Sequence, residues 1–273
     1  MPVLVRGYAK VNLSLAVLGK RADGYHELAG VMHRIGLFDT VEIEPLQGIQ
    51  VEADAPLPYH NTARRMAEGF CALTGAPGAR ISIHKSIPSE AGLGGASADA
   101  AAVLEGLEQL YGGLEPVSRA KLALSVGADV PFCLLGGTAF AQGVGERLTP
   151  IHAPRLPLVV LKGRQGVSTG ALFSQLRPPY QELDHEGMLD ALARGDLAKV
   201  GRCMQNGLEE QASAMAPEIA QLKKLLLEQG ALGACMTGSG SAVIGLFPDS
   251  VTVDSFIFNF KSNCDRFSWG DVW

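Results

Sequence analysis

The sequence predicts an α+β fold, because strand-like and helix-like segments mix without the regular spacing of repeated βαβ units. Short segments in which apolar and polar residues alternate fill the first part of the chain. An alanine-rich segment with a helical apolar stripe follows them. A length of 273 residues predicts one large domain or, more commonly, two domains of ordinary size.

The strand-like segments alternate strictly between apolar and polar residues, at residues 41–44, 49–52 and 81–84. This alternation predicts antiparallel strands with one face in water. Between the second and third segments, Asn61 is expected to be the N-cap of a helix. Met66, Phe70 and Leu73 recur at the spacing of one face of that helix.

The most regular helix is predicted from Ser97 to Tyr111, in an alanine-rich run. Its apolar stripe consists of Val103, Leu104, Leu107 and Leu110. Because these residues recur at three- and four-residue intervals, one face of the helix should pack against a core.

A cluster of prolines marks a change in the chain, at Pro150, Pro154 and Pro157. A new apolar strand is predicted directly after it, at residues 158–161. We therefore expect a domain boundary near residue 153, with one domain over residues 1–153 and a second over residues 154–273.

The second half is predicted to combine helices and strands. Helices are expected near residues 187–195, 197–213 and 217–229, and strands at residues 234–237 and 242–247. Val253, Phe256, Ile257 and Phe260 then fall at the spacing of one helical face, which predicts a final helix before a short terminal strand. Aromatic and β-branched residues also suit a strand at these positions.

Composition excludes several classes of protein. With 23 basic and 28 acidic side chains, the net charge is −5, and no strongly basic run occurs, which disfavours nucleic-acid binding. The five cysteines are widely spaced and contain no C-x-x-C pair, so neither a disulfide framework nor a zinc site is indicated. No apolar stretch is long enough to span a bilayer. We therefore expect a soluble, cytoplasmic protein without a nucleic-acid or membrane partner.

A glycine-rich loop, PSEAGLGGASA, leads directly into the predicted alanine-rich helix. Its glycines are Gly92, Gly94 and Gly95. They let backbone N–H groups approach a ligand, and a helix start adds N–H groups without partners, so the loop can hold a phosphate. The alternative is a flexible turn capped by Ser97. Asp99, in the first helical turn, would repel an anion unless it complements the helix dipole or helps to hold a cation.

Three isolated polar residues are candidates for chemistry. Lys10 and Asn12 share one side of a predicted strand, where two polar side chains ordinarily point at water. Asp129 lies between a helix end and an apolar run, directly before Val130 and Pro131. It is explained either by ordinary turn chemistry or as a general base for a substrate hydroxyl.

Two further turns carry polar or aromatic side chains. The segment MTGSGS at residues 236–241 lies between two predicted strands, and hairpin geometry alone can account for it. Tyr25 and His26 follow an Asp-Gly turn, and composition favours loop packing as the explanation of this aromatic ring and imidazole. Neither turn decides a function by itself.

Taken together, these segments resemble the three motifs of the GHMP kinases, a family named after galactokinase, homoserine kinase, mevalonate kinase and phosphomevalonate kinase. The similar segments surround Lys10, run from Pro88 to Ala101, and run from Thr237 to Ser241. The sequence RADGYHEL, from Arg21 to Leu28, resembles one branch of the family, which acts on a cytidine diphosphate-linked methylerythritol. The segments GADVPF and GVGE, which begin at Gly127 and Gly143, are similar to the same branch.

The resemblance implies a fold of two α+β domains with the active site in the cleft between them. The N-terminal domain would be similar to the second domain of ribosomal protein S5, and the C-terminal domain would be ferredoxin-like. It also implies transfer of the γ-phosphoryl group of ATP to the 2-hydroxyl of the small-molecule substrate. In that reaction Asp129 would take the hydroxyl proton, and Lys10 would steer the hydroxyl toward phosphorus.

The resemblance further implies a set of residues on the ATP side. They are Pro88, Ala91, Gly92, Leu93, Gly94, Gly95, Ala96 and Ser97 in the loop, together with Asn61 and Lys85. Magnesium would bridge the phosphates, and Ser97 or Asp99 would be its contact on the protein.

On the substrate side, the resemblance implies that Tyr25 stacks on the cytosine ring and that His26 hydrogen-bonds to its edge. Phe173 would cover the other face of the base, and Asn12 would reach the sugar-alcohol or diphosphate portion. Such stacking contributes about 1–3 kcal/mol per contact. A pocket for homoserine or a mevalonate derivative would not need these rings, and a non-catalytic nucleotide sensor would not need both Lys10 and Asp129.

The chain departs from the family pattern at three positions. Gly170 stands where proline is usual, Ala96 replaces a frequent glycine, and Gly207 follows Asn206 where an aspartate is common. Glycine in place of proline adds backbone freedom and can loosen a loop. No position that the resemblance implies to be catalytic is lost.

Overall fold

The structure is a computed structural model, and it describes residues 2–262 of the chain. The chain divides into two compact units that are interleaved along the sequence. Unit 1 contains residues 1–10, 34–88 and 94–136, and unit 2 contains residues 11–33, 89–93 and 137–273. The boundary expected near residue 153 lies within unit 2, and a division of the chain into sequential domains there stays a prediction.

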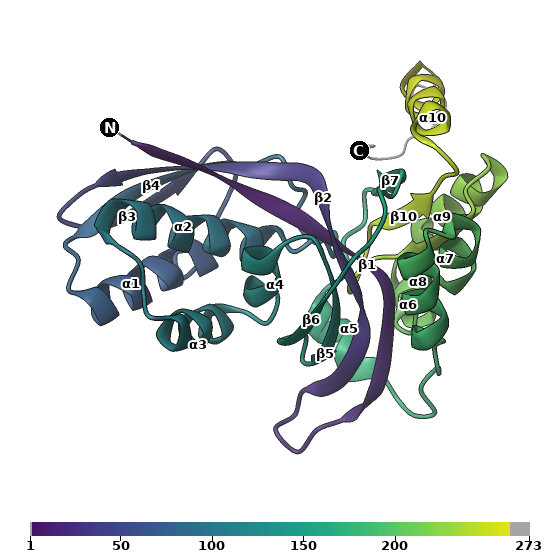
Figure 1. The fold of residues 1–273 in the computed structure, drawn as a ribbon, viewed down its shortest axis with the longest axis horizontal. Helices are drawn as coiled ribbons and strands as arrows, with labels where there is room; N and C mark the ends of the chain where they lie inside the picture. Colours follow the sequence, from purple (N-terminus) through teal and green to yellow (C-terminus); the bar gives the residue numbers. More distant parts are fainter. Residues whose placement is uncertain (1, 263–273) are drawn as a thin grey trace. The chain divides into compact units, whose positions relative to one another are not determined.

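Two long strands, β1 (Val3–Lys20) and β2 (His26–Pro45), contribute residues to both units (Figure 1). The other elements of unit 1 are β3 (Gly48–Ala53), α1 (Thr62–Thr74), β4 (Gly78–His84), α2 (Gly95–Tyr111), α3 (Pro116–Val126) and α4 (Val130–Leu135). Those of unit 2 are β5 (Thr138–Gly143), β6 (Arg147–Ile151), β7 (Leu158–Leu161), α5 (Thr169–Gln175), α6 (His185–Arg194), α7 (Leu197–Cys203), β8 (Gln205–Asn206), α8 (Glu209–Met215), α9 (Glu218–Glu228), β9 (Gly233–Met236), β10 (Val243–Leu246) and α10 (Ser250–Ser262).

In unit 1, the strands follow the order β3-β4-β2-β1, and helices α1 and α2 cover one face of β3 and β4 (Figure 1). Strand β4 pairs with β2 in the antiparallel direction, as the alternation predicts, with Val41 opposite Ile83. Strand β3 instead pairs with β4 in parallel, so the expectation of an antiparallel strand at residues 49–52 is wrong. Helix α1 lies between β3 and β4 in the chain and forms a crossover, which returns the second strand in the same direction.

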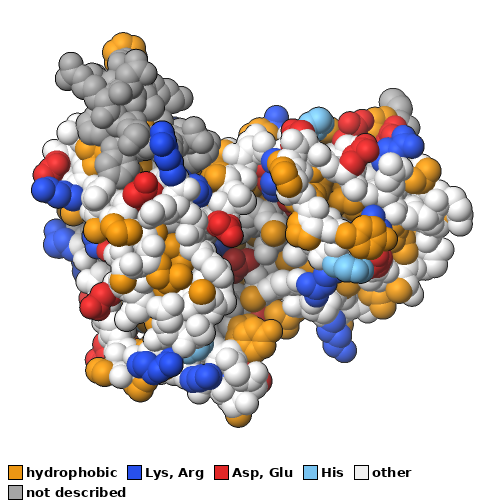
Figure 2. Space-filling view, turned by 180° about the vertical axis from the view of Figure 1, so that it is seen from behind, with side chains coloured by type: hydrophobic (Ala, Val, Ile, Leu, Met, Phe, Trp, Pro, Cys, Tyr) orange, Lys and Arg blue, Asp and Glu red, His pale blue; other side chains and the backbone are white. Residues whose placement is uncertain are grey.

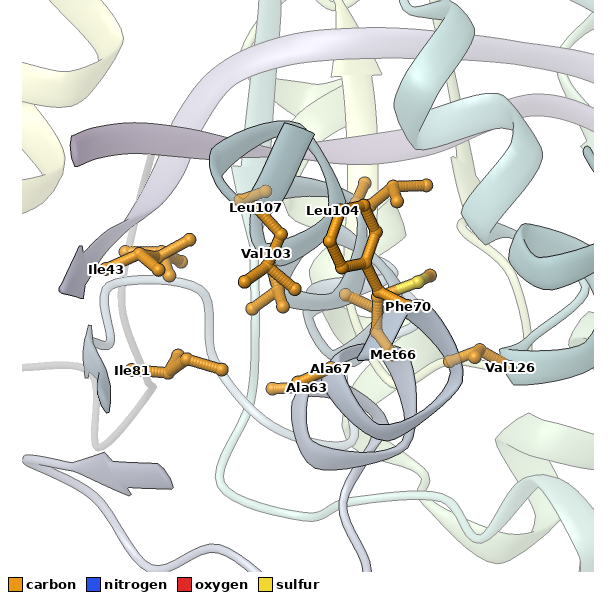
Figure 3. Close-up of a cluster of buried hydrophobic side chains, with 14 of the residues drawn as sticks. Ile43, Ala63, Met66, Ala67, Phe70, Ile81, Val103, Leu104, Leu107 and Val126 are labelled. Carbon is orange, nitrogen blue, oxygen red and sulfur yellow. The ribbon is translucent and has the colours of Figure 1, made fainter. Parts of the chain in front are cut away.

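Helix α1 begins as the sequence predicts. The side chain of Asn61 caps it by accepting a hydrogen bond from the Arg64 N–H. Met66 and Phe70 are fully buried, but Leu73 is 54% exposed, so the apolar face was placed wrongly at its third residue. The small residues that complete the buried face are Ala63 and Ala67. Figure 3 shows Phe70 beside Leu104, where α1 and α2 pack together in the core of unit 1.

Helix α2 confirms the predicted alanine-rich helix, and its stripe residues Val103, Leu104 and Leu107 are fully buried. The N-terminal part of β1 lies close to it. A Cβ atom added to Gly7 would lie 2.6 Å from the Ala98 carbonyl oxygen, so only glycine permits this approach of strand to helix.

In unit 2, strands β7, β10 and β9 form a three-stranded antiparallel sheet in that order, while β5 pairs with β2 and β6. The helix expected over residues 197–213 is wrong as a single element, because α7 ends at Cys203 and α8 begins at Glu209. Between them, β8 pairs in parallel with β1, and the Gly207 N–H donates to the Leu15 carbonyl oxygen. These bonds to a distant strand replace the helical hydrogen bonds that the segment would otherwise make.

The final helix, rather than a strand, is confirmed as α10. The Phe256 ring stacks on Phe260 at 5.7 Å between centroids and contacts Phe247 at 5.6 Å. The expected terminal strand, Cys264 and Trp269 lie outside the described residues. None of the helices in the described part of the chain is both long and apolar enough to cross a membrane.

The described cysteines are free thiols: Cys71, Cys133, Cys203 and Cys235. Burial raises the pKa of the Cys133 and Cys235 thiols far above its usual value, so both stay protonated and unreactive.

On the face shown in Figure 2, basic and acidic side chains of the described residues are interspersed. On that face the nearly balanced charge is therefore distributed rather than segregated.

The close packing of β1 on α2 predicts that Gly7→Ala destabilises the protein by about 1–3 kcal/mol, because the added methyl group would overlap backbone atoms. Gly19→Ala is the matched control, since it lies on the same strand and nothing lies within 4 Å of its added Cβ atom. Its effect should stay within about 0.5 kcal/mol. Urea unfolding of the two variants measures the difference, and equal stability would contradict the packing described here.

Candidate active site

Lys10 and Asp129 form an ion pair in unit 1, with 3.4 Å between Lys10 Nζ and an Asp129 carboxylate oxygen. The Lys10 side chain is only 5% exposed, so the expectation that it points at water is wrong. Its stem passes beside Gly94, where an added Cβ atom would lie 3.0 Å from Lys10 Cγ. Asp129 stands at the N-cap position of α4 without capping it, and its side chain is 33% exposed. The carboxylate is therefore held by an ammonium on one side and is accessible to a substrate hydroxyl on another.

The start of α2 lies beside this pair. Its N-cap is Gly94, in the left-handed region with φ of 72°, and the N–H groups of Ser97 and Ala98 donate to the Gly94 carbonyl oxygen. The alternative in which Ser97 caps the helix is therefore wrong. The first N–H groups of a helix have no partner within it, and here they belong to Gly95 and Ala96. Together with the helix dipole they make a site suited to a phosphate.

Helix α1 also begins beside this loop. The Thr62 hydroxyl donates to the Ala96 carbonyl oxygen at 2.5 Å. The Asn61 side chain accepts from Arg64 N and donates to the Pro58 carbonyl oxygen, both at 2.9 Å. Asn61, expected on the ATP side, thus serves as a helix cap next to the loop.

The first half of the glycine-rich loop belongs to unit 2 and packs on the second glycine turn. The remaining positions expected to bind ATP are Pro88, at the end of a unit 1 segment, and Ala91, Gly92 and Leu93. The Ala242 N–H donates to the Ala91 carbonyl oxygen. A Cβ atom added to Gly92 would lie 2.1 Å from the Thr237 carbonyl oxygen, so the two glycine motifs are in direct contact. Ala91 and Leu93 are buried.

Asn12 is tied to the same turn. Its backbone N–H donates to Thr237 Oγ1 at 2.8 Å, and its side chain is buried rather than directed at water. Asn206 supports the turn from β8, because its side-chain amide donates to the Met236 and Gly238 carbonyl oxygens at 2.8 Å each. Sequence reasoning did not identify this role for Asn206, which it placed inside the helix expected over residues 197–213.

An aromatic cluster lies elsewhere in unit 2. The His26 ring lies 5.2 Å from the Phe173 ring and 6.4 Å from the Tyr180 ring, measured between centroids. The structure thus brings together two of the residues expected to bind the base and adds Tyr180, which no sequence signal indicated. Burial, with a smaller contribution from Lys20, lowers the pKa of His26, so the imidazole is neutral at pH 7. Tyr25 is 66% exposed and makes no ring contact in this cluster.

Lys85 does not extend freely toward a ligand. Its ammonium donates to the carboxylates of Asp39 and Asp99, the latter at 2.7 Å. Burial acts to lower the pKa of Lys85, but the charges of Asp99 and Asp39 outweigh it and raise that pKa above its usual value. Burial also raises the pKa of Asp99 to about 7, although the Lys85 charge opposes this. Sequence reasoning missed Asp39, whose only signal was a carboxylate within the apolar run from Leu37 to Val41.

A magnesium ion would depend mainly on its phosphates. Within residues 2–262, no group of three or more His, Cys, Asp or Glu side chains is placed to hold a metal. The Asp99 carboxylate is buried against Lys85, which makes it a poor ligand. Ser97 fits better, because its hydroxyl lies 3.4 Å from a Cβ atom added to Gly127, close in sequence to Asp129. Mg²⁺ commonly binds through few protein groups and several phosphate oxygens, and a single hydroxyl such as that of Ser97 would fit this mode of binding.

Two family models match the chain. The model "GHMP kinases N terminal domain" matches residues 61–137, and the model "GHMP kinases C terminal" matches residues 188–266. The 4-diphosphocytidyl-2-C-methyl-D-erythritol kinase of Pelotomaculum thermopropionicum is 44% identical to this chain over 259 residues, which cover 91% of this chain and 90% of the relative. The chain belongs to the GHMP kinase family. The glycine-rich loop and Asp129 of this GHMP kinase lie within the segment that the N-terminal model matches.

Solved structures confirm the GHMP kinase fold expected from the sequence. A crystal structure of 4-(cytidine 5'-diphospho)-2C-methyl-D-erythritol kinase aligns with a TM-score of 0.83 and 37% identity, and the alignment covers 100% of this chain and 97% of that one. A homoserine kinase from Cytophaga hutchinsonii aligns with a TM-score of 0.75 and 21% identity over 100% of this chain and 93% of that one. At this lower identity, the second likeness shows the shared fold alone.

The buried carboxyl group of this GHMP kinase predicts a pH-dependent stability. Because the pKa of Asp99 rises from 3.8 to about 7 on folding, its stabilising contribution is complete below pH 3.8 and is lost as the pH rises through about 7. An asparagine side chain does not ionise, so Asp99→Asn does not lose this stability as the pH rises. The Tm of the variant minus the Tm of the wild type should therefore increase between pH 4 and pH 7 and then stay constant. Thermal unfolding followed by circular dichroism measures this difference.

Asp54→Asn provides the control of opposite sign. The pKa of Asp54 is lowered, chiefly by the Lys85 N–H that it accepts, so its contribution is present above the ordinary pKa and lost as the pH falls. A Tm difference for Asp99→Asn that does not change with pH would contradict a pKa of Asp99 that burial raises.

Proposed function

We propose that this chain transfers the γ-phosphoryl group of ATP to the 2-hydroxyl of 4-diphosphocytidyl-2-C-methyl-D-erythritol. The observation that carries the proposal is the Lys10–Asp129 pair beside the open N-terminus of α2, since it places a base next to a phosphate site. The names of relatives such as the Pelotomaculum protein support this acceptor. The cluster of His26 and Phe173 supports a site for a base.

The donor phosphates bind at the start of α2 in this proposal. The N–H groups of Gly95 and Ala96 and the dipole of the helix offset the negative charge. Gly94 has no side chain, so the Lys10 stem and the phosphates can both approach it. When bound, Mg²⁺ neutralises charge on the phosphates, and Ser97 is its proposed protein contact.

The chemical step requires alignment and one proton acceptor. The substrate hydroxyl oxygen bonds to the γ-phosphorus, the bond from phosphorus to the β–γ bridging oxygen breaks, and ADP leaves with that electron pair. Asp129 accepts the hydroxyl proton at its partly exposed carboxylate. Lys10 lies beside it and orients the carboxylate, because its side chain is buried and projects from strand β1.

The acceptor is recognised through its base in this proposal. The neutral His26 imidazole has both a donor and an acceptor nitrogen for the edge of cytosine. Phe173 lies against His26 and offers one face for stacking. The exposed ring of Tyr25 is free to cover the opposite face once the base is bound. Asn12, fixed by Thr237, is proposed to contact the sugar-alcohol or diphosphate part.

A coupled assay of ADP formation with Mg²⁺ tests this function directly. It compares the cytidine diphosphate-linked methylerythritol, homoserine, mevalonate and no acceptor. Turnover with the cytidine compound alone supports the proposal. Turnover with another acceptor would reject the base site but keep the Lys10–Asp129 chemistry, and no turnover with any acceptor would favour a nucleotide sensor.

Asp129→Asn removes the proton acceptor but keeps the size of the side chain. We expect kcat to fall about 10²- to 10⁴-fold, with Mg-ATP binding nearly unchanged. Steady-state kinetics together with a binding titration measure the two effects separately. A variant that turns over at the wild-type rate would show that Asp129 is not the base.

Tyr25→Ala removes one proposed stacking surface. The loss of about 1–3 kcal/mol should raise the KM for the cytidine substrate about 5- to 150-fold and leave the KM for ATP within about twofold. Because Tyr25 is exposed, the substitution should not affect folding. Equal increases in both KM values would argue against a stacking role.

A further inference from the structure

The segment that leads from β4 into the glycine-rich loop is held by carboxylates. Three consecutive backbone N–H groups donate to them: Lys85 N to Asp54 Oδ1 at 2.9 Å, and Ser86 N and Ile87 N to Asp39 Oδ1 at 2.6 Å and 2.8 Å. Successive N–H groups of this kind form a concave anion site. Here the Asp39 side chain is itself the anion, so the site is filled from within the protein.

The Asp39 side chain is fully buried, with an exposure of 0%. Its second oxygen accepts from the Lys85 ammonium. Burying a carboxylate is costly unless it is paired and hydrogen-bonded. Asp39 meets both conditions through two backbone N–H groups and one ammonium, which makes it a rigid anchor.

The anchor extends to the phosphate site through Lys85. The Lys85 ammonium also donates to Asp99 in α2, and it lies 3.7 Å from a Cβ atom added to Gly95. The side chain of Ile87, on the same anchored segment, lies 3.0 Å from that Cβ position. The first turn of α2 therefore contacts Lys85 and Ile87, two residues whose positions Asp39 fixes.

We infer that Asp39 is a positioning residue for the phosphoryl donor, which fixes residues 85–87 and, through Lys85, the first turn of α2. This inference rests on the proposed function, since it assumes that the donor phosphates bind at Gly94–Ser97. Lys85, expected on the ATP side, then acts from beneath the loop by fixing Asp99 and Gly95. Asp39 touches neither substrate and acts only through these groups.

The test measures nucleotide affinity without an acceptor, by isothermal titration of the full-length chain with Mg-ADP. Asp39→Asn keeps an oxygen for the Ser86 and Ile87 N–H groups but turns an amide toward the Lys85 ammonium. We expect the Kd for Mg-ADP to rise about tenfold or more, the scale of one charged hydrogen bond. Lys85→Met should have a similar effect. The double variant should be no weaker than the worse single one, because the two residues act as one unit.

Asp54→Asn is the matched control. It removes a carboxylate bond to the same segment, but Asp54 is half-exposed and bonds to Lys85 N and His84 rather than to the Lys85 ammonium. We expect its Kd for Mg-ADP to stay within about twofold of the wild type. In turnover assays, Asp39→Asn should raise the KM for ATP while the acceptor KM stays within about twofold, a split that general destabilisation would not produce.

Several outcomes would overturn the inference: wild-type Mg-ADP affinity in both Asp39→Asn and Lys85→Met, an equal loss in Asp54→Asn, or equal increases in both KM values. If Asp39→Asn does not fold, Lys85→Met decides. A wild-type chain that binds Mg-ADP but does not phosphorylate the cytidine compound would reject the proposed acceptor alone. Normal turnover with no effect of either variant would reject the positioning role alone.

Discussion

A loop that is proposed to bind phosphates through backbone N–H groups has few side chains with which to fix its own shape, so neighbouring groups must fix it. In this protein the first half of the loop is held in unit 2, where Ala91 bonds to Ala242 and Gly92 packs on Thr237. The second half is held in unit 1, where the network of Asp39 and Lys85 supports the start of α2. The glycines allow the close approach, and the surrounding polar groups supply the rigidity.

Polar side chains are also buried along β1, the strand that brings Lys10 beside Gly94. Lys10, Asn12 and Ser14 face one side of β1, and each is at most 5% exposed. A buried polar group is costly unless it is satisfied, so such residues commonly remain where they perform a task. Lys10 contacts the carboxylate of Asp129, and Ser14 accepts from the Val31 N–H across to β2. On one face, β1 therefore carries both Lys10, which pairs with Asp129, and Ser14, which bonds to β2.

Local signals in the sequence predicted the elements that local interactions stabilise. The Asn61 cap and helix α2 are examples, because their residues act within one or two turns. The break between α7 and α8 was not predictable in this way, since Asn206 bonds to carbonyl groups about thirty residues away in β9 and its turn. The direction of β3 was missed because alternation reports which face is buried and not which strand is adjacent. Lys10 and Asp129 were paired only by family resemblance, and neither Asp39 nor Tyr180 carried a pattern that spacing could reveal.

The carboxylate anchors at residues 85–87 also have a consequence for dynamics. This segment belongs to no helix or strand, and such connections usually exchange their amide protons quickly with solvent. Here each of the three amide protons is donated to a carboxylate, and two of them to the fully buried Asp39. Exchange at Ser86 and Ile87 then requires Asp39 to leave its site, so deuterium uptake there should be as slow as in the neighbouring strands. The amide protection expected of this irregular connection is thus that of regular secondary structure.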